Sequence, residues 1–274
     1  MSLLLLWAAA PALALSLWLL QIAGAPRSAQ ALQLVVASVA VAAHVVAARS
    51  RGTPPAVDAP WLPVVLAASL FIPLLSGGSD APARWLTLGS VRLYLPPVVL
   101  PIALLFLGAR PVAALRAASI ITATVALMLQ PDGSQLTAFA VATLAILATS
   151  RAQRLLRATL AAILLAGAVA AWRIPDPLAP VSYVEGVFSV AAGVSPFALL
   201  AAVVSAVLPV LALAWTARAT HSSGTFAVAV YYAALFALAP LQVTPVPLLG
   251  FGAGPILGYF LAAGAVSRRQ TSAA

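Results

Sequence analysis

Long apolar runs separated by short polar or Pro/Gly-rich stretches are the feature that most restricts how this chain can fold. A helix needs roughly 20 mainly apolar residues to cross a hydrocarbon layer of about 30 Å, with its backbone polar groups paired internally. Ten such runs occupy residues 3–22, 30–48, 61–76, 95–109, 111–129, 136–150, 156–172, 196–216, 225–241 and 247–266. With 64% hydrophobic and 7% charged residues, the sequence predicts an all-α, polytopic transmembrane helical bundle of about ten spans.

The lengths of the runs leave some of the spans open. Those at 95–109 and 136–150 are short enough to cross only when tilted or extended into their loops, so eight or nine spans are the alternative to ten. The stretch 184–215 is long instead, about 48 Å as one helix, and Pro196 is expected to split it. We therefore expect a short interfacial or re-entrant segment at 184–194 and a span at 196–216, and we treat residues 1–274 as one integral membrane domain.

The arginines predict the orientation of the chain. All 14 basic residues are arginine, and ten spans would place both termini on one side. That side holds Arg49, Arg51, Arg110, Arg116, Arg151, Arg154, Arg157, Arg218, Arg268 and Arg269, whereas Arg27, Arg84, Arg92 and Arg173 lie opposite. The positive-inside rule then makes both termini cytoplasmic. The net charge of +9 is explained by this topology and by anionic membrane lipid, so no nucleic acid partner is expected.

Several function classes have no sequence signal. The chain has no cysteine, which excludes disulfides and thiolate metal sites. Its two histidines, His44 and His221, are isolated, and no metal site is predicted. A Walker loop and a Rossmann fingerprint are also missing, which argues against an ATP-driven pump.

Acidic residues and three motifs gather on the side opposite the termini. Four of the five acids, Asp80, Asp132, Asp176 and Glu185, fall in its loops. The motifs there are Arg-Trp-Leu-Thr-Leu-Gly at 84–89, Leu-Gln-Pro-Asp at 129–132 and Val-Thr-Pro-Val-Pro-Leu at 243–248. In this order and within ten spans, they resemble the SEDS family (shape, elongation, division and sporulation; FtsW/RodA-like), the polytopic polymerases of bacterial peptidoglycan.

The chain also departs from the family pattern. The Gln-Pro-Ser-Glu motif and a downstream Lys of the family are replaced by Leu-Pro-Pro-Val at 95–98 and by Pro101. The family's long outer loop, which ends in a catalytic Asp, is short here. The run that starts at Tyr183 aligns Glu185 with that Asp, which keeps the charge and moves it one methylene outward.

The resemblance implies glycan polymerisation from lipid-linked precursors at the outer face of the bacterial cytoplasmic membrane. This reaction needs a general base for the acceptor hydroxyl and cationic groups for the departing pyrophosphate. Glu185 or Asp176 is expected to be the catalytic base. The expected substrate-binding residues, with the arginines suited to phosphate, are Arg84, Trp85, Gln130, Asp132, Arg173 and Thr244. No resident cofactor is expected, although Asp132 or Asp176 could hold a divalent cation.

Each of these residues also has an ordinary structural interpretation. Asp132 could be a turn former or helix cap, and Asp176 lies between Pro175 and Pro177 in what would be a rigid turn. Arg84 beside Trp85 could be an interfacial anchor. Glu185 is the exception, since an acid at the start of an apolar run is costly unless it is paired or hydrated.

Two other functions remain open on the sequence. One is a catalytically inactive SEDS relative that binds lipid-linked precursor or a cell-wall synthase, and in the family the usual partner is a single-span transpeptidase. The other is a small membrane transporter, in which Pro/Gly-broken segments near 196 and 247–258 would be discontinuous helices around a midplane site.

Overall fold

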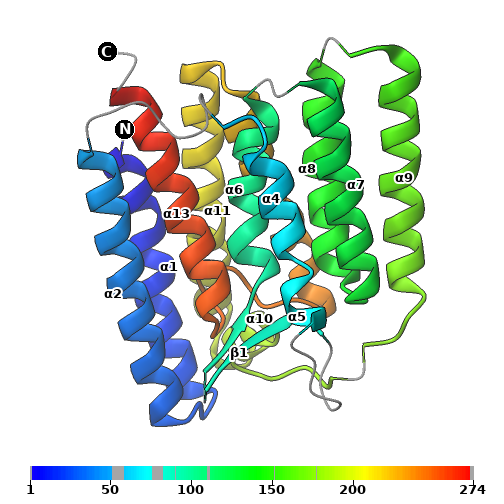
Figure 1. The fold of residues 1–274 in the computed structure, drawn as a ribbon. Coiled ribbons are helices and arrows are strands. Elements are labelled where there is room, and N and C mark those ends of the chain that lie inside the picture. Colours follow the sequence, from blue (N-terminus) through cyan, green and yellow to red (C-terminus); the bar gives the residue numbers. More distant parts are fainter. Residues whose placement is uncertain are drawn as a thin grey trace.

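The fold is a bundle of helices whose axes run roughly side by side (Figure 1). A computed structural model describes residues 2–50, 59–75, 83–89, 91–109, 112–150, 152–176 and 178–271. The helices are α1 (Ser2–Ile22), α2 (Arg27–Arg49), α4 (Leu62–Ser69), α5 (Ile72–Leu75), α6 (Pro96–Gly108), α7 (Ala113–Leu129), α8 (Gly133–Thr149), α9 (Arg154–Trp172), α10 (Val187–Val194), α11 (Pro196–Thr220), α12 (Ser223–Leu238) and α13 (Ala253–Thr271). The expected all-α polytopic bundle is confirmed.

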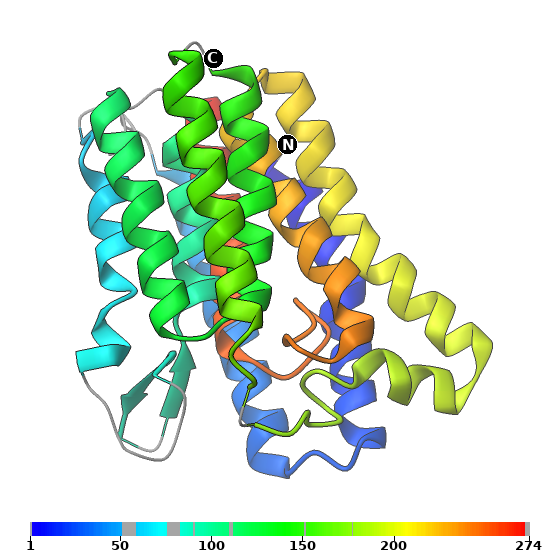
Figure 2. The same ribbon diagram turned by 90° about the vertical axis from the view of Figure 1, so that its right-hand side faces the viewer.

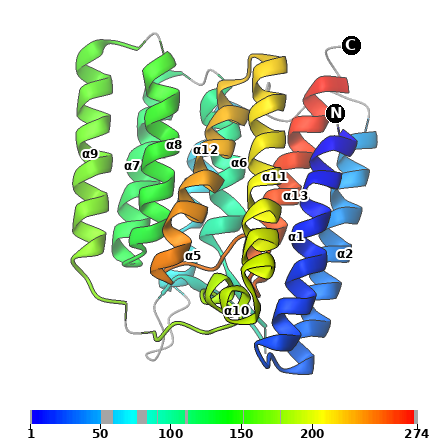
Figure 3. The same ribbon diagram turned by 180° about the vertical axis from the view of Figure 1, so that it is seen from behind.

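Each of the ten predicted runs corresponds to one pass through the bundle, with α4 and α5 together forming a single broken pass. By length and hydropathy, α1, α2, α9, α11 and the segment Ser223–Leu241 could each cross a membrane, and α6, α7 and α8 are shorter apolar helices. Both termini lie at the same end of the bundle (Figures 1 and 3). The chain is therefore described below by its terminal end and its opposite, outer end.

The interior is packed with aromatic rings and closely approaching glycines. Tyr232 packs edge-to-face on Tyr259, with ring centroids 5.6 Å apart. A Cβ added at Gly258 of α13 would lie 1.8 Å from the carbonyl oxygen of Pro97. Without a hydrophobic effect between helices in lipid, such close backbone approach is a main source of association. The order of the bundle thus depends on small residues as much as on large ones.

Proline and serine separate α10 from α11, as the sequence indicated. Ser195 is extended, and its hydroxyl accepts a hydrogen bond from the N–H of Ala198 to cap the first turn of α11. Pro196 occupies the first helical position, where no N–H is required. The expected break at Pro196 is therefore confirmed, with the short helix α10 starting at Val187 rather than at 184. Figure 2 shows α10 turning away from α11 at the outer end.

A β-hairpin at the outer end was not predicted from the sequence. Strands β1 (Trp85–Leu88) and β2 (Val91–Tyr94) pair antiparallel, with Trp85 opposite Tyr94. These two rings stack across the strands at 5.0 Å, a contact that stabilises paired strands. Gly89 adopts φ of 61°, which glycine reaches without steric cost. The hairpin ends where α6 begins and so fixes Arg84 and Tyr94 near the bundle.

The last helix begins later than the sequence indicated. The expected run 247–266 is helical only from Ala253, because an irregular loop at 242–252 enters the bundle after the short 3-10 turn η1 (Ala239–Leu241). Val246 and Leu249 in this loop are fully buried. Irregular backbone inside a bundle must still pair its polar groups, and here Val184 and Gln33 supply partners to the loop.

Candidate functional site

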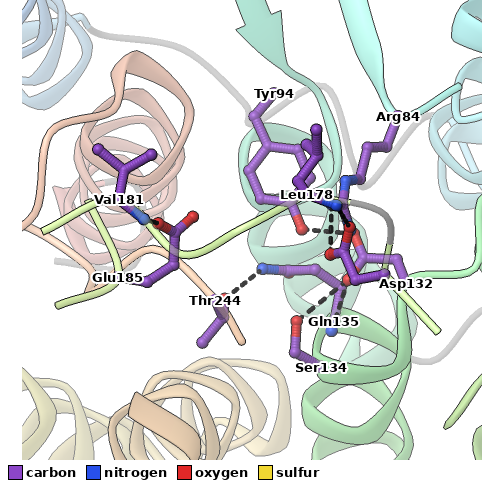
Figure 4. Close-up of polar contacts among 10 residues, drawn as sticks. Arg84, Tyr94, Asp132, Ser134, Gln135, Leu178, Val181, Glu185 and Thr244 are labelled. Carbon is purple, nitrogen blue, oxygen red and sulfur yellow. Dashed lines mark hydrogen bonds and ion pairs between the residues drawn. The ribbon is translucent and has the colours of Figure 1, made fainter. Parts of the chain in front are cut away.

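Polar side chains from four separate segments converge at the outer end of the bundle (Figure 4). They come from the β-hairpin, from the start of α8, from the loop between α9 and α10, and from the buried loop at 242–252. Charged and amide groups that are buried in the protein are costly unless they are paired. The pairs they form therefore show what the site can do.

Arg84 and Asp176 form an ion pair. The guanidinium Nη2 of Arg84 donates to Oδ2 of Asp176 at 2.5 Å, and the Arg84 side chain is 9% exposed against 37% for Asp176. Burial opposes the charge of Arg84, but the nearby Tyr94, Asp132 and Asp176 outweigh it and raise the pKa of Arg84. Among the described residues Nε of Arg84 is buried with no hydrogen-bond partner, so this donor is available to a further acceptor.

Asp176 also orders its own turn, as its flanking prolines suggested. Its Oδ1 accepts the N–H of Leu178 at 3.0 Å, the hydrogen bond typical of an Asx turn. The carboxylate thus has both a structural partner and Arg84. Because it is the more exposed half of the ion pair, Asp176 is the partner that an entering anion could displace.

Asp132 is a buried helix cap. Its Oδ1 accepts the N–H of Gln135 at 3.2 Å and the hydroxyl of Ser134 at 3.1 Å, which satisfies the first turn of α8. Its Oδ2 accepts the hydroxyl of Tyr94. Burial raises the pKa of Asp132, and the attraction of Arg84 opposes that rise. The capping interpretation of Asp132 is therefore confirmed.

Thr244 is joined to the same cluster by the side-chain amide of Gln135. Nε2 of Gln135 donates to the hydroxyl of Thr244 at 3.5 Å, and the hydroxyl of Tyr231 donates to Oε1 of Gln135. All three side chains are fully or almost fully buried. Gln135 therefore ties the buried loop and α12 to the start of α8, directly beneath Asp132.

Glu185 lies across Thr244 and Gln135 from Asp132 in the view of Figure 4. Its carboxylate accepts the N–H of Val181 at 2.9 Å. Partial burial raises the pKa of Glu185, and that N–H hydrogen bond opposes the rise. Arg84 lowers this pKa and Asp176 raises it through their charges, so the ion pair acts electrostatically on Glu185.

The backbone on either side of Glu185 is held by the buried loop. The N–H of Val246 donates to the carbonyl of Val184 at 3.2 Å, and the N–H of Phe251 donates to the carbonyl of Tyr183 at 2.8 Å. A Cβ at Gly250 would lie 2.2 Å from that Val184 carbonyl. The loop at 242–252 thus fixes where Glu185 begins its turn into α10.

The other predicted residues have no hydrogen bond to Asp132, Asp176 or Glu185 among the contacts of the described residues. Trp85 stacks on Tyr94 and so supports the hairpin wall. Gln130, the C-cap of α7, is fully buried, and its amide donates to the carbonyl of Leu70. Arg173 is the exposed C-cap of α9. Asp80 lies outside the described residues.

The sequence interpretation did not assign Tyr94, Gln135 or Tyr231 to the site. Each of the three is a polar or phenolic side chain within or beside an apolar run. In a membrane bundle such a side chain usually faces the interior and pairs with another polar group, and this pattern could have indicated them. The described residues hold no group of three or more His, Cys, Asp or Glu side chains that could bind a metal ion. The oxygens of Asp132 are moreover already engaged by Tyr94, Ser134 and Gln135.

Comparison with solved structures identifies the architecture. A scan of family models and a search of curated proteins give no match. The crystal structure of the rod shape determining protein RodA of Thermus thermophilus is similar, with a TM-score of 0.66, 20% identity, and coverage of 96% of this chain and 94% of that one. A crystal structure of an aspartate-to-alanine mutant of that RodA matches equally well. The chain has the RodA fold.

This fold agrees with the layout expected from the SEDS resemblance. The RodA fold holds over nearly the whole of both chains. Together with the apolar helices, it identifies the chain as a membrane protein. At 20% identity the likeness gives the fold, and the activity must be argued from the site.

Proposed function

We propose that this chain is a SEDS-like protein of bacterial cell-wall synthesis, multi-pass in the cytoplasmic membrane. In this proposal it joins lipid-linked disaccharide precursors at the outer face. One observation carries the proposal. Glu185 is a partly buried acid with a raised pKa, and it lies close enough to the Arg84–Asp176 ion pair for both charges to act on that pKa. A base with a raised pKa and a neighbouring cation are what glycosyl transfer to a hydroxyl requires.

The reaction assigns a role to each group. Glu185 takes the proton of the acceptor hydroxyl as its oxygen forms a bond to the anomeric carbon of the donor. The bond from that carbon to the pyrophosphate oxygen breaks, and the lipid pyrophosphate leaves with the electron pair. Arg84 receives the developing phosphate charge, since guanidinium donors suit bidentate phosphate contact.

Substrate entry would exchange partners on Arg84. Its Nη2 is held by Asp176, whereas its Nε has no partner among the described residues. A phosphate oxygen can bind Nε directly and can displace Asp176, whose side chain is 37% exposed. Asp176 then becomes free to assist Glu185 or to contact a divalent cation brought by the phosphates. Arg173 at the exposed end of α9 would extend the cationic surface.

Replacement of Glu185 by Gln tests the proposal. Gln keeps a carbonyl oxygen that can accept the N–H of Val181, so the local turn should persist while the base is lost. With lipid-linked disaccharide-pentapeptide and a single-span transpeptidase partner, glycan chain formation should fall by roughly 10²-fold or more. The amount and elution volume of purified protein should be unchanged. Unaltered polymerisation by Glu185→Gln would remove Glu185 from the mechanism.

A non-catalytic relative is the second candidate, and one observation favours it. The charge of Arg84 is already neutralised by Asp176, which is typical of an ion pair whose role is structural. If the unaltered protein forms no glycan with its partner yet binds lipid-linked precursor, the binding function is the correct one. Loss of that binding in Arg84→Gln would then locate the precursor at this site.

A further inference from the structure

Two adjoining cavities lie at the terminal end of the bundle, far from the polar cluster at the outer end. The larger, about 1200 Å³, is formed by α1, α8, α11 and α12. The smaller, about 610 Å³, lies where α6, α7, α8 and α12 meet. Both are lined by Thr149, His221, Ser222 and Ser223. The two cavities therefore meet at the turn between α11 and α12.

The larger cavity is an apolar groove open on the side of the bundle. Its wall includes Trp7, Leu211 and Trp215, which are 68%, 58% and 66% exposed. On α11 the lining runs from Leu208 to Arg218, a rise of about 15 Å at 1.5 Å per residue. That is half of a hydrocarbon layer of about 30 Å. The groove thus follows the depth of one lipid leaflet.

The smaller cavity is cationic and rich in hydrogen-bond donors. Arg116 lines it, and Nε of Arg116 is buried with no hydrogen-bond partner among the described residues. Ser222 caps α12 and accepts from the N–H and the hydroxyl of Thr225, which leaves its own hydroxyl proton for another acceptor. The first turn of α12 adds the partial positive charge of a helix N-terminus.

No described carboxylate lies near these donors. Asp132 lies just before α8, and Asp176 and Glu185 lie between α9 and α10, all at the outer end of the bundle. His221, which is exposed, lines both cavities, and the exposed Arg218 lines the groove. An anion entering from the membrane surface would therefore meet Arg218 in the groove and Arg116 in the smaller cavity.

We infer that these cavities form a binding site for an anionic glycerophospholipid of the arginine-rich leaflet. The head-group phosphate binds Arg116 and the Ser222 turn, and the acyl chains lie in the groove between α1 and α11. The positive charge of the cavities favours an anionic head group. The length and apolar lining of the groove favour acyl chains that enter it from the bilayer. This site is separate from the one proposed for glycan chemistry.

Lipid titration followed by native mass spectrometry tests the inference. Purified, delipidated protein is titrated with phosphatidylglycerol, with phosphatidylcholine of the same chains, and with phosphatidylglycerol in excess inorganic phosphate. The Arg116→Gln variant removes the cation. Arg154→Gln, which changes an arginine at the same end that lines neither cavity, is the matched control. Ala214→Phe fills the groove and leaves every charge in place.

The inference predicts that phosphatidylglycerol binds more tightly than phosphatidylcholine. Arg116→Gln should weaken phosphatidylglycerol binding by about tenfold, as expected for the loss of a charged hydrogen bond, while Arg154→Gln should leave it unchanged. Ala214→Phe should weaken it as well, and decides the matter if Arg116→Gln does not fold. Equal binding of the two lipids, or unchanged binding by Arg116→Gln or Ala214→Phe, overturns the inference. Displacement of the lipid by inorganic phosphate alone would assign a free-anion site instead.

Discussion

Three buried tyrosines give a graded test of the polar cluster, because their hydroxyls have different partners. Tyr94 donates to the carboxylate of Asp132, and Tyr231 donates to the amide oxygen of Gln135. The hydroxyl of Tyr232 is buried with no partner among the described residues. Replacement of each by Phe removes one oxygen and keeps the ring, so packing changes little and the hydrogen bond alone is tested.

The expected costs follow from the acceptor. A hydrogen bond to a charged group contributes about 1.5–3 kcal/mol and a neutral one about 1 kcal/mol. Tyr94→Phe should therefore destabilise most, and Tyr231→Phe less. Tyr232→Phe should be neutral or stabilising, since it removes a hydroxyl whose burial is uncompensated.

Thermal unfolding of the three variants in one detergent, at one heating rate, measures this order. At roughly 2 °C per kcal/mol for a chain of this size, Tyr94→Phe should lower the apparent Tm by about 5 °C. The same variant should leave Tyr232 packed on Tyr259. A loss in Tyr232→Phe as large as that in Tyr94→Phe would refute the view that hydrogen bonding, and not ring packing, holds this cluster.

Two further predictions concern helix packing and pH. Gly258→Ala places a methyl 1.8 Å from the Pro97 carbonyl and should prevent α13 from docking on α6. Gly193→Ala, where nothing lies within 4 Å, should be neutral or stabilising by about 0.4–1 kcal/mol. Folded yields measured by size exclusion check the pair, and equal yields would contradict it. Burial raises the pKa of Asp132 above its ordinary 3.8, so the folded protein holds the proton of Asp132 more tightly than the unfolded chain. The stability that this difference adds is complete below pH 3.8 and is lost as pH rises through the folded pKa. Asp132→Asn should lack this loss when the free energy of unfolding is followed against pH, and an unchanged pH slope would exclude Asp132 as its source.

The sequence determined the membrane bundle and much of its topology. Apolar runs of span length can satisfy their backbone only as helices in lipid, and this local rule located all ten passes and the break at Pro196. Asp132 as a cap and Asp176 in a turn were also predictable, because both roles depend on neighbours within a few residues.

The tertiary structure alone decided which side chains meet. The partners Arg84 and Asp176 are 92 residues apart, and Gln135 and Thr244 are 109 residues apart, so no local pattern could pair them. The hairpin at 85–94 depends on a cross-strand ring stack, and the irregular loop at 242–252 depends on partners in α2 and beside Glu185. Hydropathy measures how readily a segment leaves water, whereas these contacts depend on which buried donor finds which acceptor once the helices have packed.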